Sequence, residues 1–177
     1  MKKIFALVVL AFAAISASAQ VYVGGSLGFT RDASVNQTTF TLAPEVGYSF
    51  NEKWTLGGVL DYTYKYNRGI DSNKFSLSPY ARYTYARVAN DQLSFFVDGG
   101  FGIGIVERKG DDSGTLFNIG FKPGLAYSFN DHCSIVAHVG FFGYEAASDN
   151  AEAYGYHNKF SFDFSSMNLN FGFYYTF

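Results

Sequence analysis

The sequence has a single cysteine, Cys133, among 177 residues. One thiol cannot form an internal disulfide, so the chain is not a small domain held together by cross-links. Basic charge is also scarce, with 13 Lys and Arg against 15 Asp and Glu. No cluster of basic residues offers a surface for DNA or RNA, and we expect no nucleic-acid partner.

Long apolar runs are missing from the chain beyond residue 19. No stretch there approaches the roughly 18 consecutive apolar residues of a transmembrane helix. A chain of this kind could cross a membrane only with β-strands. Strands in lipid must close into a barrel, because an open edge leaves backbone groups unpaired. Aromatic residues make up 20% of the chain, which suits strands that meet a lipid interface.

The first 19 residues have the parts of a secretory signal peptide. Two lysines precede the apolar run 4–15, and small residues at 16–19 offer the positions that a signal peptidase recognises. We expect cleavage after Ala19, which leaves a mature domain at 20–177. Loss of the two lysines leaves 11 basic and 15 acidic residues, a net charge of -4. The residue directly after the cleavage point is Gln20 and not a cysteine, so a lipoprotein anchor is not expected.

From Val21 onward, apolar and polar residues alternate with the period of two that a β-strand requires. In the segment 54–66, for example, Trp54 and Leu56 fall on one face and Asp61 on the other. The same alternation predicts eight strands, at 21–30, 40–50, 54–66, 74–87, 93–106, 115–129, 133–145 and 159–177.

The connections between these strands alternate in length. The short ones are 51–53, 88–92 and 130–132, and the longer, more polar ones are 31–38, 67–73, 107–114 and 146–158. An up-and-down barrel with an even number of strands has both termini on the periplasmic side. We therefore expect an all-β fold: an eight-stranded antiparallel up-and-down transmembrane β-barrel with short periplasmic turns and four extracellular loops.

A short pattern recurs once per hairpin, at the ends of the even-numbered strands. The pattern is a proline, then an apolar residue, and then three consecutive residues: Tyr, either Ser or Thr, and an aromatic residue. It occurs at 44–50, 79–85 and 123–129. The segment 171–177 repeats the aromatics without the proline. The hairpin is therefore the repeating unit, and the aromatics occupy the place of a periplasmic girdle. The prolines are Pro44, Pro79 and Pro123.

Two features predict departures from a regular ladder. Proline cannot donate a ladder hydrogen bond, so we expect a local bulge at each of the three prolines. In the eighth strand, aromatic residues occupy even positions at 160–164 and odd positions at 171–177. A bulge near Ser165 and Ser166 would reconcile the two halves. Alternatively, 160–164 rises above the membrane, where the facing of side chains matters less.

The signal segment, the eight alternating strands and the terminal Tyr175-Thr176-Phe177 together resemble the small OmpA/OmpX-type family of outer-membrane barrels. The resemblance covers nearly the whole mature chain and implies the bacterial outer membrane, with its lipids, as the location. Tyr175 and Phe177 resemble the signal that the outer-membrane assembly machinery reads, which implies a transient contact with that machinery. No periplasmic domain follows Phe177, so a cell-wall tether is not expected. We expect a monomer.

The alternation also places seven polar side chains inside the barrel: Glu45, Asp61, Lys65, Arg82, Asp98, Lys122 and His138. An eight-stranded barrel has an interior just wide enough for side chains to fill. Unpaired buried charges are costly, so we expect these groups to pair with one another and plug the lumen. Inward glycines next to Tyr80, Phe96, Phe142 and Tyr144 let large and small residues interdigitate, or leave a hydrocarbon-sized cavity; the interior volume decides between the two.

No catalytic, metal or cofactor site is predicted. Asp98 and His138 resemble part of a hydrolase dyad, but no serine is placed by spacing as the nucleophile. His132 and His157 fall in a turn and a loop, without metal-site spacing. The charged loop 107–114 lacks the spaced oxygen ligands of a calcium loop. Recognition, including an extracellular ligand, would then be carried by the loops.

The sequence predicts a non-enzymatic scaffold that presents four loops. The alternatives are a narrow gated pore and a barrel that binds or modifies lipid acyl chains.

Overall fold

The computed structural model describes residues 20–32, 37–67, 70–108, 110–163 and 169–177. The expected signal peptide at 1–19 lies outside these residues. No helix in the described part of the chain has the length and apolar character needed to cross a membrane. The elements are β1 (Gln20–Asp32), β2 (Gln37–Ser49), β3 (Trp54–Asn67), β4 (Ile70–Val88), β5 (Leu93–Arg108), β6 (Gly114–Ser128), β7 (Cys133–Val139), β8 (Phe141–Ala147), α2 (Asp149–Ala153), β9 (Lys159–Asp163) and β10 (Leu169–Thr176).

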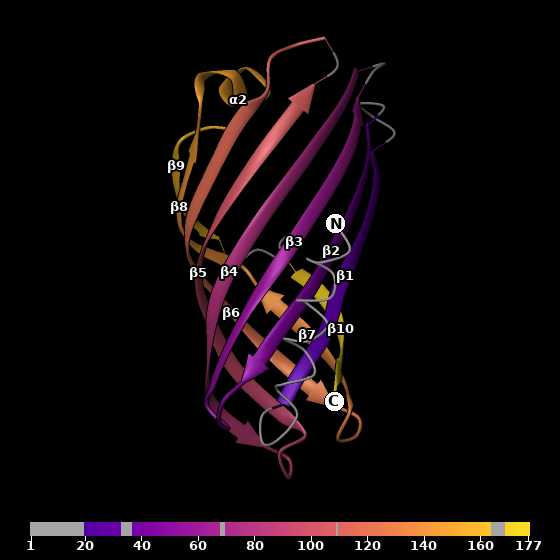
Figure 1. Cartoon of the computed structure of the whole chain (residues 1–177), viewed down its shortest axis with the longest axis vertical. Coiled ribbons are helices and arrows are strands. Elements are labelled where there is room, and N and C mark those ends of the chain that lie inside the picture. Colours follow the sequence, from indigo (N-terminus) through magenta and orange to yellow (C-terminus); the bar gives the residue numbers. More distant parts are fainter. Residues whose placement is uncertain (1–19, 33–36, 68–69, 109, 164–168) are drawn as a thin grey trace, which may run out of the picture.

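The strands form a closed antiparallel barrel (Figure 1). From β1 to β6, each strand pairs with the next one in the chain. β6 pairs with both β7 and β8, β7 pairs with β10, and β10 pairs with β1. β7 and β8 together form the seventh strand of the wall, and β9 and β10 form the eighth. The prediction of an eight-stranded antiparallel barrel is confirmed.

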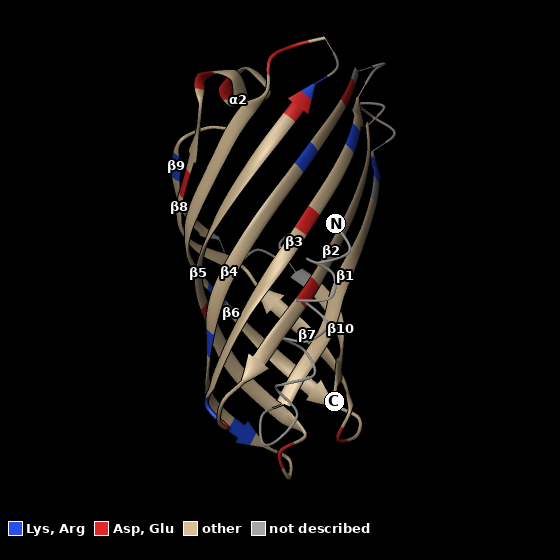
Figure 2. Cartoon of the chain, viewed as in Figure 1, with Lys and Arg blue, Asp and Glu red and all other residues tan. Residues whose placement is uncertain are grey.

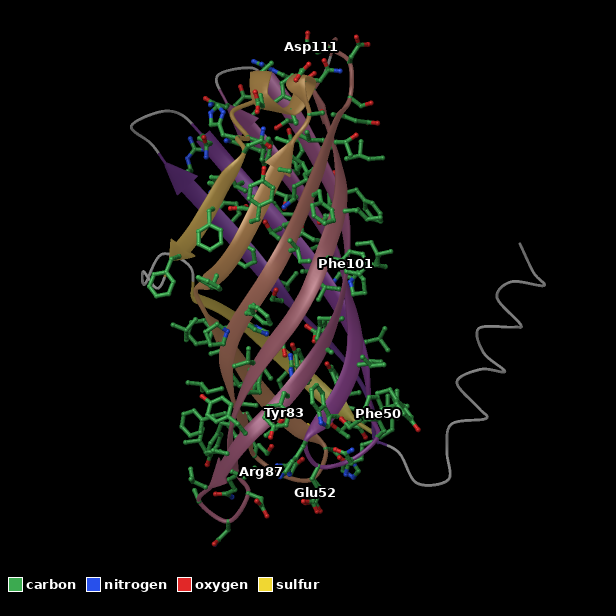
Figure 3. All side chains as sticks on the ribbon, turned by 90° about the vertical axis from the view of Figure 1, so that its left-hand side faces the viewer. Phe50, Glu52, Tyr83, Arg87, Phe101 and Asp111 are labelled. Carbon is green, nitrogen blue, oxygen red and sulfur yellow. The ribbon has the colours of Figure 1, made fainter. Side chains whose placement is uncertain are left out.

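The outward face is apolar along the middle of the barrel. Phe101 points away from the wall at mid-height, whereas Arg87 and Glu52 lie at one end and Asp111 at the other (Figure 3). Charged positions occur at both ends and at several places on the strands between them (Figure 2), and Glu45, Arg82 and Asp98 among the latter are buried. The outward residues follow the predicted alternation; on β5 they are Phe101, Ile103 and Ile105.

The strand predicted at 133–145 is broken at Gly140, whose positive φ of 76° suits glycine. The pairing with β6 shifts by one residue between β7 and β8. A shift of one residue turns every following side chain to the other face. Phe142 and Tyr144 therefore lie outside, with 37% and 44% exposure. The prediction that these two rings point inward is wrong.

The aromatic residues of the eighth strand change parity as the sequence predicts. In β9, Phe160 and Phe162 lie outside and pair with the outward Tyr144 and Phe142 of β8. In β10, the outward positions are the odd ones, such as Phe171. The bulge expected near Ser165 and Ser166 lies outside the described residues.

A bulge was predicted at each of the three prolines, and this prediction is wrong at Pro44 and Pro79. The β2–β3 ladder lacks a pair at Pro44, and the β4–β5 ladder lacks one at Pro79, but the register on the two sides is the same. A missing N–H thus interrupts the ladder without adding a residue. Pro123 keeps its pair with Val97, and the shift near it comes from Gly140 on the neighbouring strand. The register shift of the β4–β5 ladder lies at Tyr85 instead.

The connection predicted at 67–73 is mostly strand. β3 and β4 pair up to Asn67 and Ile70, which leaves residues 68–69 between them. Polar residues are tolerated there because they pair across the strands: the Tyr62 and Tyr64 hydroxyls donate to the side chains of Asn73 and Asp71, each at 2.8 Å. The segment 67–73 is polar because the outward apolar face ends there, although the two strands continue.

The short helix α2 was not predicted, and it joins two loops. Asn150 donates to the carbonyl of Ser113 at 3.1 Å, and the Tyr154 hydroxyl donates to the carbonyl of Asp112. Ala151 is fully buried against Gly114. The connections 107–114 and 146–158 therefore pack together as one unit. Desolvation and the carboxylates of Asp111 and Asp112 raise the pKa of Tyr154 in this unit.

Candidate functional site

The seven predicted inward polar residues divide into a central cluster and three separate positions. Glu45, Arg82, Asp98 and His138 meet in the barrel interior, where the first three are 6–9% exposed. Asp61, Lys65 and Lys122 do not join them. The cluster is the densest arrangement of charge in the described structure, and we treat it as the candidate site.

Arg82 and Asp98 form the centre of the cluster. The two residues are direct ladder partners on β4 and β5. The guanidinium donates twice to the carboxylate, with Nε–Oδ1 at 2.7 Å and Nη2–Oδ2 at 2.8 Å. Such bidentate pairs are among the stronger charged contacts in proteins. Nε2 of His138 lies 2.8 Å from Asp98 Oδ2, so the carboxylate has a partner on each side.

Glu45 is held mainly by phenol groups. Tyr22 donates to its Oε1 at 3.0 Å and Tyr174 to its Oε2 at 2.6 Å. Tyr80 also donates to Oε1, and Arg82 Nη2 lies 3.5 Å from the same oxygen. The Arg82 guanidinium therefore contacts two carboxylates. The tyrosine hydroxyls donate to Glu45 the hydrogen bonds that a second cationic side chain would otherwise provide. No buried side-chain N or O atom of the described residues is left without a hydrogen-bond partner.

Aromatic rings enclose the guanidinium. The Arg82 Cζ lies 4.0 Å from the centre of the Phe96 ring and 5.3 Å from that of Tyr80. Tyr22 and Tyr174 stack on one another, with ring centres 4.9 Å apart. Arginine stacks readily on aromatic faces while its edge donates to carboxylates. The rings thus pack around the guanidinium, while Glu45, Asp98 and His138 also line a cavity.

Each of these four rings lies over a glycine directly opposite it in the ladder. The pairs are Tyr22 with Gly47, Tyr80 with Gly57, Phe96 with Gly124 and Tyr174 with Gly24. A Cβ added at any of these glycines would come within 2.2–2.4 Å of the facing ring. Interdigitation of large and small residues therefore accounts for this part of the inner wall.

Gly47→Ala is expected to lower the free energy of unfolding by about 1–3 kcal/mol, the usual cost of overpacking a filled interior. The added methyl group would meet the Tyr22 ring and displace its hydroxyl from Glu45. Urea unfolding in detergent measures the change. Gly58→Ala is the control, since a Cβ there meets nothing within 4 Å. Equal unfolding midpoints for the two variants would show that the ring does not depend on the glycine.

A cavity of about 710 Å³ lies beside the cluster and extends toward the longer loops. Glycines such as Gly28 and Gly120 line it, so here they leave open space in addition to room for rings. Asp61 is one of its acidic residues and pairs at 3.2 Å with Lys74, which the sequence analysis missed. Lys122 also lines the cavity, whereas Lys65 does not.

Sequence reasoning also missed Tyr22, Tyr80 and Tyr174 as partners of Glu45. Their even positions put them on the inward face, which was a usable signal, but tyrosine was interpreted as packing or as interfacial girdle. Lys74 was missed because it was taken as the first residue after a loop. In the structure it is the ladder partner of Thr63, opposite the inward face of β3.

The cluster does not have the arrangement of a hydrolytic site. His138 contacts Asp98, Arg82 and the edge of Phe96, and within the described residues no serine or threonine hydroxyl hydrogen-bonds to it. A nucleophile must lie within hydrogen-bond reach of its base. The described residues also contain no group of three His, Cys, Asp or Glu side chains placed to hold a metal ion.

The chain was compared with known protein families, curated sequences and solved structures. The sequence profile of a family described as outer membrane protein beta-barrel domain matches residues 4–177. Among solved structures, the chain is similar to the N-terminal β-barrel domain of Pseudomonas aeruginosa OprF, with 15% identity, 90% of this chain and 98% of that one covered, and a TM-score of 0.49. It is also similar to Neisserial surface protein A, with 13% identity, coverage of 90% and 94%, and a TM-score of 0.49. The Yersinia pestis outer membrane protein Ail gives 16% identity, coverage of 90% and 98%, and a TM-score of 0.46. No curated protein sequence matches.

Proposed function

The chain belongs to the outer membrane protein beta-barrel domain family, and from that premise we propose that it is a non-enzymatic scaffold with a closed lumen. Its location is the bacterial outer membrane. In this proposal the barrel is a rigid anchor, the interior cluster shuts it to ions, and four extracellular loops carry whatever recognition the protein performs.

The observation that carries the proposal is the cluster of Glu45, Arg82, Asp98 and His138 with its surrounding rings. An ion crossing the barrel would have to displace side chains that are paired with one another and packed against aromatic faces. Removing one member of a buried ion pair is strongly unfavourable. The cluster therefore supports a lumen that stays closed at this level.

The paired loops support the scaffold role. The connections 107–114 and 146–158 contact each other through Asn150, Ala151 and Tyr154. The Cζ of Arg108 lies 5.7 Å from the centre of the Tyr154 ring, and its Nε lies 3.8 Å from Oδ2 of Asp111. Loops held in one arrangement on a rigid barrel can present a fixed surface to an extracellular ligand.

The remaining partners follow from the location. Outer-membrane lipids surround the outward apolar face, and we propose a transient contact between the terminal aromatics, Tyr175 and Phe177, and the assembly machinery. The proposed scaffold acts as a monomer. It needs no cofactor. Among the residues that the structure describes, no serine or threonine hydroxyl hydrogen-bonds to His138, which supports a non-enzymatic role over a lipid-modifying one.

Planar-bilayer recording tests the closed lumen. Purified wild-type protein is expected to give no stable conductance step above the detergent baseline, because the cluster occupies the lumen. A lipid-extract assay on the same preparation is expected to show no turnover. Steady, sizeable conductance would favour the narrow gated pore, and turnover that disappears in His138→Ala would favour a lipid-modifying enzyme.

A further inference from the structure

The cavity beside the cluster has the size and lining of a ligand site. Its volume of about 710 Å³ falls within the roughly 300–1,000 Å³ of small-molecule pockets. Polar groups that point into it include the side chains of Ser76, Ser78, Asn118 and Ser161. Aromatic and aliphatic groups line the rest. Such walls can hydrogen-bond a hydroxylated solute while they exclude bulk water from part of its surface.

The charges around the cavity are paired, with one exception. Asp61 pairs with Lys74 at 3.2 Å, and Glu145 pairs with Lys159 at 3.0 Å. Asp98 and Glu45 are held by the cluster. Of the lysines that line the cavity, Lys122 is the one with no carboxylate within 4.0 Å among the described residues.

Lys122 is directed into the cavity and not into the membrane. It lies on the inward face of β6, opposite Asp98 in the β5–β6 ladder. Its Nζ lies 5.9 Å from the centre of the Phe141 ring, which lines the same cavity. The side chain is exposed, so its ammonium group is open to a ligand in the cavity.

We propose that this cavity binds a small organic anion, a carboxylate or a phosphate ester, with its charge at Nζ of Lys122. A positive group that lacks an internal partner favours an anion, and the paired carboxylates around it do not compete for the same ammonium. The hydroxyl and amide groups of the wall would take hydrogen bonds from the rest of the ligand. This binding goes beyond the scaffold role and does not depend on it.

The ligand could come from two sources. One is the external medium, since the cavity extends toward the longer loops. The other is the membrane: Leu27 and Phe171 line the cavity although both are outward-facing and 73% and 60% exposed. Leu27 and Phe171 lie next to the pair of Ser26 with Gly172 that joins β1 to β10, and the cavity reaches the outer wall at these two residues. An anionic amphiphile could enter there with its head group at Lys122.

Calorimetric titration of the purified full-length barrel in neutral detergent tests the proposal. The soluble probes are glycerol 3-phosphate and glycerate, with uncharged glycerol as the reference, and the membrane probe is a lysophosphatidic acid. At least one anionic probe is expected to bind saturably, and glycerol is not. In Lys122→Gln the affinity is expected to fall about tenfold or more, as for loss of a charged hydrogen bond. Lys65→Gln is the matched control, because Lys65 faces inward but does not line the cavity.

A second pair of variants tests the cavity without touching its charge. Gly28 lines the cavity, and a Cβ added there has ordinary contact with Thr41 at 3.4 Å. Gly28→Leu is expected to fill part of the space and weaken binding, whereas Gly58→Leu, on the outward face, is expected to leave it unchanged. This pair also decides the question if Lys122→Gln does not fold.

Each outcome has a defined meaning. Binding of lysophosphatidic acid alone, weakened by Lys122→Gln, or by Gly28→Leu if Lys122→Gln does not fold, would support the site and identify the membrane as the source. Binding of a soluble anion with the same dependence would support it with the medium as the source. The proposal is overturned if no anion binds saturably, or if a folded Lys122→Gln variant binds as tightly as wild type. Either result leaves the closed lumen of the scaffold proposal untouched, since conductance tests that separately.

Discussion

Arg82→Met is expected to lower the free energy of unfolding by about 3–5 kcal/mol, the usual cost of breaking a buried ion pair by removing one partner. The substitution would leave the carboxylates of Asp98 and Glu45 buried without their shared cation. Urea titration followed through the fluorescence of Trp54, the single tryptophan, measures the change.

Two further variants show whether the loss comes from uncompensated charge. Arg31→Met removes an exposed arginine that donates one hydrogen bond, to the Thr38 hydroxyl, and is expected to change the unfolding midpoint little. Combining Arg82→Met with Asp98→Leu and Glu45→Gln removes the unpaired charges and should recover much of the stability. If Arg82→Met alone unfolds like wild type, the ion pairs do not hold the interior together.

Deletion of Phe177 is expected to remove most of the protein from the outer membrane. The Phe177 backbone N–H donates to the carbonyl of Val21 at 2.9 Å, at the seam where β10 closes on β1. Its ring packs edge-to-face on Tyr175, which in turn stacks on His132. Loss of the residue would weaken both the seam and the proposed assembly signal. Quantitative blotting of isolated outer membranes measures the level.

Deletion of Gly110 is the comparison for this result. Gly110 lies in the 107–114 connection, and a Cβ there would meet nothing within 4 Å. Its removal is expected to leave the outer-membrane level close to wild type, because loop residues of this kind tolerate change. Equal levels of the two deletion variants would show that Phe177 has no special part in assembly.

The number of strands and the facing of their side chains could be predicted because alternation has a period of two. A shift of one residue would turn the whole apolar face of a strand to the wrong side, so the pattern must be kept. Glu45, Arg82 and Asp98 were placed inside on this ground alone. The pattern failed after Gly140, where one left-handed residue turned Phe142 and Tyr144 outward. The sequence has 19 glycines, and nothing in it shows that Gly140 is the one after which the side chains change face.

The partners inside the barrel could not be predicted from alternation. The stagger between neighbouring strands decides which inward side chains lie at the same height, and this stagger cannot be derived from the alternation. Glu45 lies far along the chain from Tyr174, yet the two meet across the seam. Lys122 was expected to pair with one of the other inward groups, and Asp98 is its ladder partner. Arg82 and His138 bind that carboxylate instead.

Thiol labelling of intact cells tests most directly whether the cluster shuts the lumen. In a Cys133→Ser background, Ser76→Cys places a thiol in the cavity on the loop side of the cluster. Ser94→Cys places one on the inward face of β5, two residues beyond Phe96 toward the short turns. A membrane-impermeant maleimide added outside is expected to label the first variant and spare the second, which should react only after the cells are opened. Equal labelling of both from outside would show that the lumen is open from end to end.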